Sequence, residues 1–145
     1  MEERLERVKS QMLNSDTTFP LLREYLVSRG EVRASFKYYH GPNQWQKRFY
    51  QEEHVFLTDR AIVIACLYNN GKMTILSVLL SEIARIERDY DFAAKDSKNL
   101  VLANVAIRLK RTLKKKDPDE LVFKRPLPEE QGDPQGYEEL VALLD

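Results

Sequence analysis

The pattern of hydrophobic and polar residues changes from a helical period to alternation near residue 31, and it returns to helical spacing near the end of the chain. Two apolar stripes at helical spacing precede that point and predict two amphipathic helices within residues 1–30. The first stripe consists of Leu5, Val8, Met12 and Leu13. The second consists of Leu21, Leu22, Tyr25 and Leu26, with Pro20 placed in the first helical turn and Gly30 at the helix end. Each apolar stripe must pack against another surface. The candidates are the β domain of the same chain, a second copy of the chain and another protein.

From Glu31 onward, apolar residues alternate with polar ones, which predicts strands with one buried face. The run Ala61–Tyr68 is continuously apolar, so we expect a central strand that is covered on both faces. Asn69, Asn70 and Gly71 then favour a tight hairpin, because these residues accept a positive φ. The expected strands cover residues 32–38, 45–51, 61–68, 72–80, 83–92, 100–109 and 120–124.

The order of these elements predicts a mainly β fold with helices. Strands joined by short turns favour an antiparallel arrangement, either as two packed sheets or as one bent barrel. A last apolar stripe at helical spacing predicts a C-terminal helix that covers one opening or face of the strands: Tyr137, Leu140, Val141 and Leu144. We therefore expect a helical extension, residues 1–30, followed by one β domain with its C-terminal helix, residues 31–145.

Composition limits the partners and the compartment. The chain has 145 residues, and its 23 basic and 23 acidic side chains balance, so there is no general attraction to nucleic acid or to anionic membranes. A single cysteine, Cys66, allows no internal disulfide and is expected to be a small buried residue. The apolar runs are too short to span a bilayer. We expect a cytoplasmic protein.

Residues suited to catalysis are few. His40 is expected in a turn, and His54 is expected in an exposed or partly exposed loop between strands. Asp89 and Asp91 alternate with Tyr90 and Phe92, so the two carboxylates are expected on a solvated strand face opposite a buried one, or as an acid pair. No glycine-rich phosphate loop and no zinc-ligand spacing is present. We expect no enzyme, cofactor or metal; the alternative is a small β-barrel ligand carrier or enzyme that uses His40, His54, Asp89 and Asp91.

One basic run is the sharpest local charge feature. It consists of Arg108, Lys110, Arg111, Lys114, Lys115 and Lys116. Two interpretations stay open: a site for phosphorylated groups or an acidic peptide, or a solvated hairpin tip that the acidic residues after Asp117 neutralise. Lys47 and Arg48, among the aromatic residues near the first hairpin, are a second candidate surface for a partner. The alternative is that Trp45 and Phe49 pack in the core and leave these charges outside.

Several segments together resemble the pleckstrin-homology-like superfold, particularly its bacterial PH and GRAM-like members. They are Trp45–Phe49, His54–Arg60 leading into Ala61–Cys66, and Leu80–Ile83 with Ile86. The resemblance covers roughly residues 31–145, because the last strand and helix also match. It implies a seven-stranded, bent antiparallel barrel or sandwich that is non-enzymatic and binds lipids, peptides or proteins.

The basic motif of lipid-binding members is only partly matched. Lys37 and Lys47 fit its first two positions, but Phe49 stands in the place of the final arginine, so no lipid site is carried over. We expect a protein or peptide partner. An anionic membrane surface is a further candidate through Lys110–Lys116, and homo-oligomers are a candidate through the N-terminal helices. Nucleic acid is not expected, because stacking aromatics are missing beside the basic run.

Overall fold

The computed structural model describes residues 2–39, 52–68, 70–110, 120–127 and 132–144. Within these ranges the α-helices are α1 (Glu2–Gln11), α2 (Ser15–Val27) and α3 (Pro134–Ala142). The strands are β1 (Val32–Tyr39), β2 (Glu52–Thr58), β3 (Ala61–Leu67), β4 (Met73–Leu79), β5 (Ile83–Phe92), β6 (Leu100–Leu109) and β7 (Glu120–Lys124). One turn of 3-10 helix, η1 (Leu80–Glu82), lies between β4 and β5. No described helix is long and apolar enough to cross a membrane.

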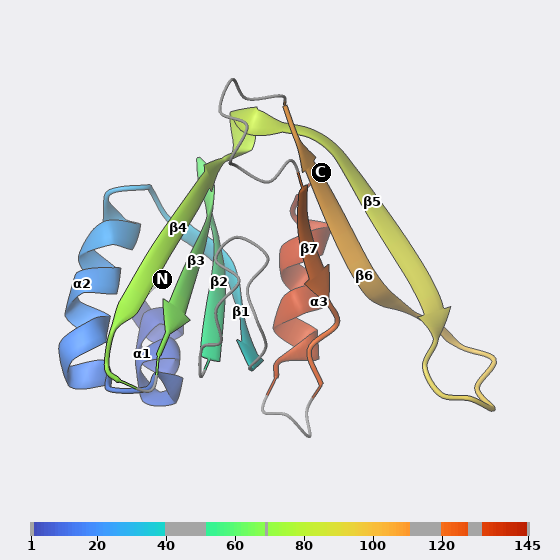
Figure 1. Ribbon diagram of the computed structural model, residues 1–145, viewed down its shortest axis with the longest axis horizontal. Helices are drawn as coiled ribbons and strands as arrows, with labels where there is room; N and C mark the ends of the chain where they lie inside the picture. The colour runs from blue at the N-terminus through green and yellow to red at the C-terminus, as the bar shows by residue number, and fades with distance from the viewer. Residues whose placement is uncertain (1, 40–51, 69, 111–119, 128–131, 145) are drawn as a thin grey trace.

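The described strands form two antiparallel sheets, with the orders β1-β2-β3-β4 and β5-β6-β7 (Figure 1). The mainly β, antiparallel architecture with a C-terminal helix is thereby confirmed. No hydrogen-bonded pair joins the two sheets among these strands, so they do not form a closed barrel. The chain passes from one sheet to the other at η1, where Leu80 donates its backbone N–H to the carbonyl oxygen of Arg60.

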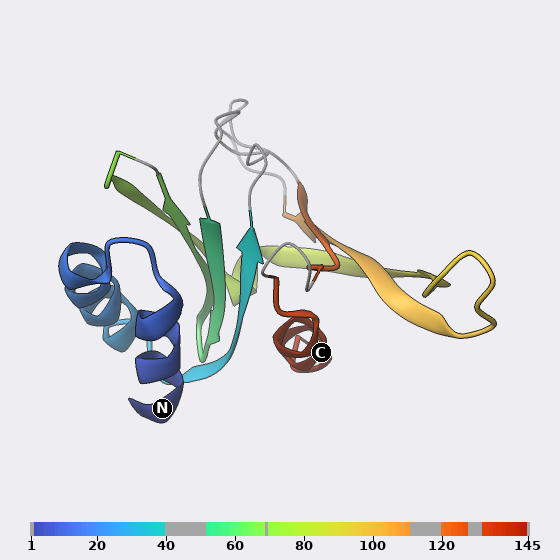
Figure 2. The same ribbon diagram turned by 90° about the horizontal axis from the view of Figure 1, so that it is seen from below.

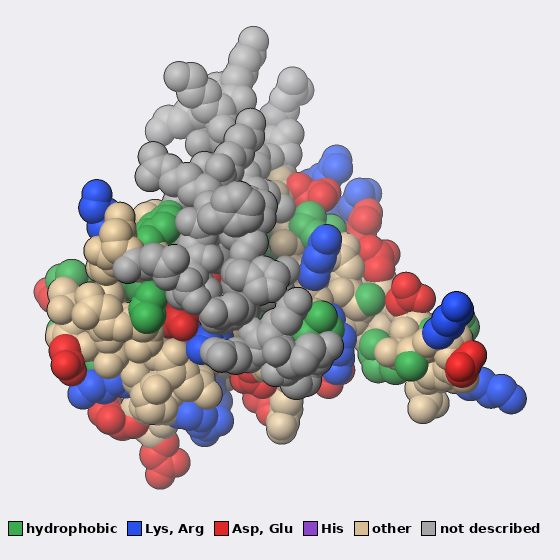
Figure 3. All heavy atoms as spheres, turned by 60° about the horizontal axis from the view of Figure 1, so that its bottom comes forward, with side chains coloured by type: hydrophobic (Ala, Val, Ile, Leu, Met, Phe, Trp, Pro, Cys, Tyr) green, Lys and Arg blue, Asp and Glu red, His purple; other side chains and the backbone are tan. Residues whose placement is uncertain are grey.

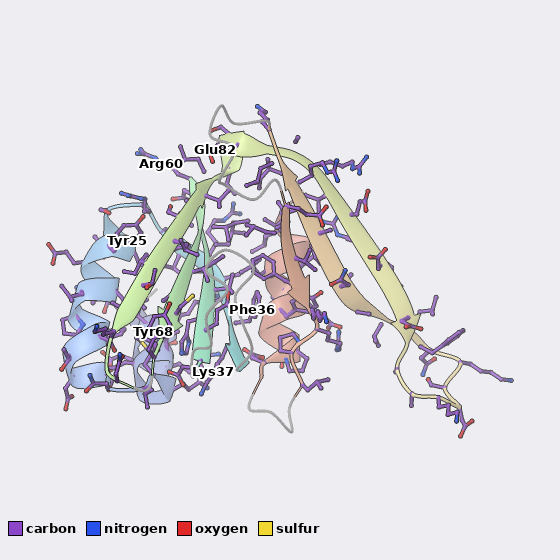
Figure 4. All side chains as sticks on the ribbon, viewed as in Figure 1. Tyr25, Phe36, Lys37, Arg60, Tyr68 and Glu82 are labelled. Carbon is purple, nitrogen blue, oxygen red and sulfur yellow. The ribbon has the colours of Figure 1, made fainter. Side chains whose placement is uncertain are left out.

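The larger core lies between the two sheets and α3. Phe36 of β1 meets the rings of Phe123 and Tyr137 edge-on, at centroid distances of 5.9 and 5.4 Å. Figure 4 shows Phe36 between the four-stranded sheet and α3. Gly136 lets α3 approach β1 closely, because a Cβ at this position would clash with the Ser35 carbonyl oxygen. The final helix is thus held beside the free edge of β1.

The opposite face of the four-stranded sheet is covered by α1 and α2 (Figure 2). Most of the two apolar stripes form a second core with the sheet, so the strands supply their cover. Leu21, expected in the second stripe, is 60% exposed, and Phe19 is buried instead. The buried residues of this core are Leu5, Val8, Met12, Phe19, Leu22, Leu26, Val32, Phe56, Ala61, Val63, Ala65 and Leu67. As expected, β3 is buried along its whole length.

Two expected boundaries are wrong. Helix α2 begins at Ser15, so Pro20 lies beyond the first turn, and Asn14 makes the reversal from α1 with φ 55° and ψ 42°. Asparagine tolerates this left-handed conformation, which shortens the connection. The expected strand at residues 45–51 lies outside the described residues, while residues 52–58, expected only to lead into a bend, form β2.

Candidate functional site

A buried cluster of charged side chains lies beneath α1, on β1 and β2. The Glu52 carboxylate lies 3.3 Å from the Lys37 ammonium and 3.2 Å from Nε2 of His54. Lys37 and His54 are directly opposite each other in the β1–β2 ladder, and Glu52 is two residues before His54, so all three point to one face. That face is the one that the N-terminal helices cover.

The same cluster ties the N-terminal helices to the sheet. The backbone N–H of Leu13, between α1 and α2, donates to the Glu52 carboxylate at 2.5 Å. The Lys37 ammonium donates to the carbonyl oxygen of Gln11 at 3.2 Å. Lys37 is therefore used inside the fold, although it matches the first position of the lipid-binding motif.

The electrostatics of Glu52 follow from these contacts. Burial alone would raise the pKa of its carboxyl group, because it disfavours the charged form. Hydrogen bonds from His54 and Leu13 and the nearby charges of His54 and Lys37 outweigh burial and lower the pKa. Glu52 is consequently a carboxylate at neutral pH.

His54 does not lie in the exposed loop that we expected. It is part of β2 and is 2% exposed, and its ring stacks on Phe56 at a centroid distance of 6.5 Å. The prediction is wrong because burial of His54 depends on its partner Glu52. In the sequence, Glu52 is indistinguishable from the other charged residues of a polar stretch. A buried imidazole needs such a hydrogen-bonding partner.

A polar cavity of about 130 Å³ lies next to this cluster, between α1, β1 and the N-terminal part of α3. Its charged lining residues are Arg4, Arg7, Lys37, His54, Asp133 and Glu139. Ser35 also lines the cavity, but no hydrogen bond joins its hydroxyl group to His54. Ser35 and His54 are therefore not joined as the hydroxyl and base of a nucleophilic pair.

A second candidate surface is the outer end of the β5–β6 hairpin, which extends beyond α3 (Figure 1 and Figure 2). Tyr90 and Phe92 on β5 are each 57% exposed, and Leu100 on β6 is 58% exposed. Phe92 is directly opposite Leu100, and Tyr90 is directly opposite Leu102, so the four side chains share one face of the hairpin. We call Tyr90, Phe92 and Leu100 the hairpin patch.

The hairpin patch continues a face that is buried nearer the centre of the molecule. On this face Ile86 is opposite Ile107, and both pack in the larger core. Further out, Arg88 donates to the carbonyl oxygen of Val141 in α3 at 3.1 Å. Beyond that contact Leu102 is still buried in the larger core, whereas Tyr90, Phe92 and Leu100 on the same face are more than half exposed. Figure 3 shows hydrophobic side chains on the narrow lobe that the hairpin forms at the right of the view.

Asp89 and Asp91 lie on the other face of β5, as the alternation predicted. Asp89 accepts a hydrogen bond from the side chain of Asn104 at 3.4 Å, and Asp91 accepts one from the N–H of Phe92 at 2.8 Å. The expected burial of the opposite face is wrong at Tyr90 and Phe92. Alternation fixes which residues share a face, whereas burial depends on how far α3 and the first sheet extend.

The described members of the alternative catalytic set do not meet. His54 belongs to the first sheet, whereas Asp89 and Asp91 belong to the second. His40 lies outside the described residues. Within the described ranges, no three His, Cys, Asp or Glu side chains are placed to hold a metal ion.

The basic run is only partly described. Arg108 pairs with Glu120 at 3.5 Å, and both side chains are largely exposed. Lys110 donates its backbone N–H to the carbonyl oxygen of Glu82. The other members, Arg111, Lys114, Lys115 and Lys116, lie outside the described residues, as do Lys47 and Arg48. The Arg108–Glu120 pair is one instance of the neutralisation by later acids that we considered.

Comparisons with known proteins add no relative: no family model matches the chain, and no curated protein and no solved structure matches it significantly.

Proposed function

We propose that this chain is a non-enzymatic, PH-like binding module of the cytoplasm that holds an extended segment of a protein partner on its β5–β6 hairpin. The observation that carries the proposal is the hairpin patch, in which Tyr90, Phe92 and Leu100 are more than half exposed on one face. Exposed apolar patches on a monomer commonly mark interaction sites. Ser35 and His54 line one cavity without a hydrogen bond between them, so the cavity gives no sign of a serine–histidine pair.

The size of the hairpin patch favours a short segment over a second copy of the chain. With about 200 Å² for a fully exposed aromatic side chain, the three residues expose roughly 300 Å². A stable protein–protein interface buries about 800 Å² on each partner. The patch alone falls well short of that, but it fits a few side chains of a peptide.

The outer edge of β5 favours a partner segment in an extended conformation. β5 is the outermost strand of its sheet among the described strands, so one row of its backbone groups faces away from β6. An added strand would satisfy these groups and place every second side chain beside Tyr90 and Phe92, on the same face of the sheet. Its other side chains would lie beside Asp89 and Asp91, which favours lysine or arginine there. The partner segment is therefore an extended peptide that alternates apolar and basic residues.

A set of synthetic peptides tests this proposal by fluorescence anisotropy with the full chain. An alternating apolar–basic peptide should bind saturably, while an alternating apolar–acidic peptide and a scrambled peptide of the same composition should bind at least about ten-fold more weakly, a difference of ~1.4 kcal/mol. Phe92→Ser should weaken binding by a similar factor. Leu21→Ser is the matched control, because Leu21 is an equally exposed apolar residue on α2. Equal binding of all peptides, or equal effects of both variants, would contradict the proposal.

Sedimentation with anionic vesicles distinguishes binding to a membrane surface from binding to a peptide. Salt-sensitive sedimentation with the vesicles that is unchanged by Phe92→Ser, together with no peptide binding, would indicate a membrane surface instead of a peptide.

A further inference from the structure

We infer that the outer edge of β4, together with the neighbouring flank of α2, binds a second copy of this chain. The two copies pair β4 with β4 in an antiparallel manner around a twofold axis perpendicular to the sheet. The inference goes beyond the proposed function, because β4 belongs to the first sheet, whereas the hairpin patch belongs to the second.

β4 is an edge strand without the usual protection against pairing with another chain. It ends the order β1-β2-β3-β4, so among the described strands it is paired only with β3. Its seven residues contain no charged residue and no proline, and its register with β3 runs without a shift. Charges, prolines and bulges are the features that commonly protect edge strands. A further strand can therefore continue the ladder along the whole length of β4.

The side chains of β4 suit an apolar partner strand. Met73 and Ile75 pack partly on the second core, and Leu76 packs partly on the larger core. Leu79 is 44% exposed. By contrast, β5 carries five charged residues among its ten, which suits a partner of complementary charge. β4 offers no charge to such a partner.

α2 spans the same length of the first sheet as β4 (Figure 1 and Figure 2). At its start, Asn14 lies next to the β3–β4 hairpin, where a Cβ at Gly71 would come within 3.3 Å of the Asn14 side-chain nitrogen. After its end, the N–H of Glu31 donates to the Asp59 carboxylate in the turn between β2 and β3, at 3.1 Å. The middle of α2 is therefore level with the middle of β4 along the strand direction.

The flank of α2 that faces away from α1 carries no charge. It consists of Thr17, Leu21 and Tyr25, at helical spacing. The opposite flank faces α1, because Arg23 pairs with Glu2 of α1 at 2.8 Å. Leu21 is 60% exposed. The uncharged surface of the β4 edge thus continues onto the helix layer.

A second copy covers both layers of this surface at once. Pairing centred on Leu76 uses all seven residues of β4 and places Met73 of each copy opposite Leu79 of the other. Neither β4 nor the α2 flank then buries a charged side chain. The same twofold axis turns the Leu21 side chains of the two copies toward each other. An added peptide strand would cover only the edge of β4 and leave Leu21 exposed.

The size of the surface predicts a weak dimer. The edge of β4 is about 23 Å long at about 3.3 Å per residue, and the strand and helix layers together are about 20 Å thick. The footprint is therefore roughly 450 Å² per copy and roughly 900 Å² in total, below the about 1,200 Å² at which stable interfaces begin. The dimer should accordingly form and dissociate with protein concentration.

Sedimentation equilibrium of the full chain at increasing protein concentration tests the inference. The average mass should rise from that of the monomer to that of the dimer. Ser77→Lys and Leu21→Lys should each raise the dissociation constant of the dimer at least about ten-fold. Ser77 is exposed on β4, and a lysine there would lose hydration beside Ile75 of the second copy. A chain that stays monomeric at all concentrations would overturn the inference.

Matched lysine variants locate the surface. Val27→Lys adds the same charge at a position that is 49% exposed, six residues after Leu21 and therefore on another side of α2. Ser10→Lys adds it at an exposed serine of α1. Both should dimerise like the wild type. Effects equal to those of Leu21→Lys and Ser77→Lys would contradict the assignment of β4 and α2.

Two further measurements separate this inference from the peptide proposal. Phe92→Ser should dimerise like the wild type, and Ser77→Lys should bind the alternating apolar–basic peptide like the wild type. Circular dichroism should show the wild-type spectrum for each variant, so that a lost dimer reports the surface and not the fold. Loss of the dimer in Phe92→Ser would place the contact on the hairpin and overturn the inference.

Discussion

Replacement of Glu52 by glutamine tests whether the buried charge cluster fixes the N-terminal helices to the sheet. Glutamine has nearly the same volume and keeps a carbonyl oxygen that accepts hydrogen bonds from the Leu13 N–H and from His54. The variant loses the negative charge opposite Lys37, whose side chain is 11% exposed, and it replaces the acceptor oxygen beside the ammonium by an amide NH2 group. The packing of the second core should stay intact, so the change in stability reports the charge.

The magnitude follows from the three contacts of Glu52. Hydrogen bonds to a charged group contribute about 1.5–3 kcal/mol, compared with about 0.5–1.5 kcal/mol for neutral ones. Loss of roughly 1 kcal/mol in each of three contacts gives about 3 kcal/mol, within the range for breaking a buried pair. The Lys37 ammonium keeps its bond to the Gln11 carbonyl oxygen, which limits the loss. We expect the free energy of unfolding of Glu52→Gln to fall by about 2–3 kcal/mol.

Urea unfolding at neutral pH, followed by circular dichroism, measures this difference. Glu87→Gln is the matched control, because Glu87 pairs with Arg85 at 2.6 Å on the surface and both side chains are more than half exposed. Exposed pairs contribute at most about 1 kcal/mol, and often less. A loss for Glu52→Gln no larger than that for Glu87→Gln would refute the role of the cluster.

Three further predictions concern stability. The pKa of Glu52 is lowered in the folded state, so its contribution to the free energy of unfolding is complete above the ordinary value of 4.5. That contribution is lost as the pH falls through the lowered pKa. The difference in urea midpoint between wild type and Glu52→Gln should therefore narrow below that pH. Gly136→Ala should cost about 2 kcal/mol by overpacking against Ser35, despite the higher helix propensity of alanine, and an unchanged thermal midpoint would contradict the close packing of α3. Tyr137→Phe should cost about 1–2 kcal/mol in urea unfolding, because the Phe123 carbonyl oxygen loses the buried hydroxyl donor 3.2 Å away; no loss would mean that this oxygen finds another partner.

Much of the fold could be predicted from the sequence, because in most elements the pattern of apolar and polar residues matches the burial of the side chains in the structure. The continuous apolar run gives β3, and the alternation of Ala34 and Phe36 gives the face of β1 in the larger core. Val32 was expected on that same face, but a register shift between Val32 and Ala34 places it in the second core, under the N-terminal helices. The start of α2 was missed, since it depends on a single asparagine in a left-handed conformation. The strand at residues 52–58 was missed because charged residues that pair inside the fold resemble a loop in the sequence.

The candidate sites could be predicted less well, because they depend on contacts between distant segments. The cavity combines residues from α1, β1, β2 and α3, and no spacing along the chain indicates that Arg7 and Glu139 line the same cavity. The hairpin patch was visible as an alternation of Tyr90 and Phe92 with two aspartates. The exposure of the hairpin patch could not be predicted, because burial on that face of β5 depends on where α3 and the first sheet end.

Backbone amide hydrogen exchange of β5, measured by NMR with and without the alternating apolar–basic peptide, tests the binding-module account most directly. Peptide binding should slow exchange at alternate amides between residues 85 and 92 and shift the resonances of Tyr90 and Phe92, while α1 and α2 stay unchanged. A bound peptide that leaves β5 exchange unaltered, or shifts confined to other elements, would contradict the account.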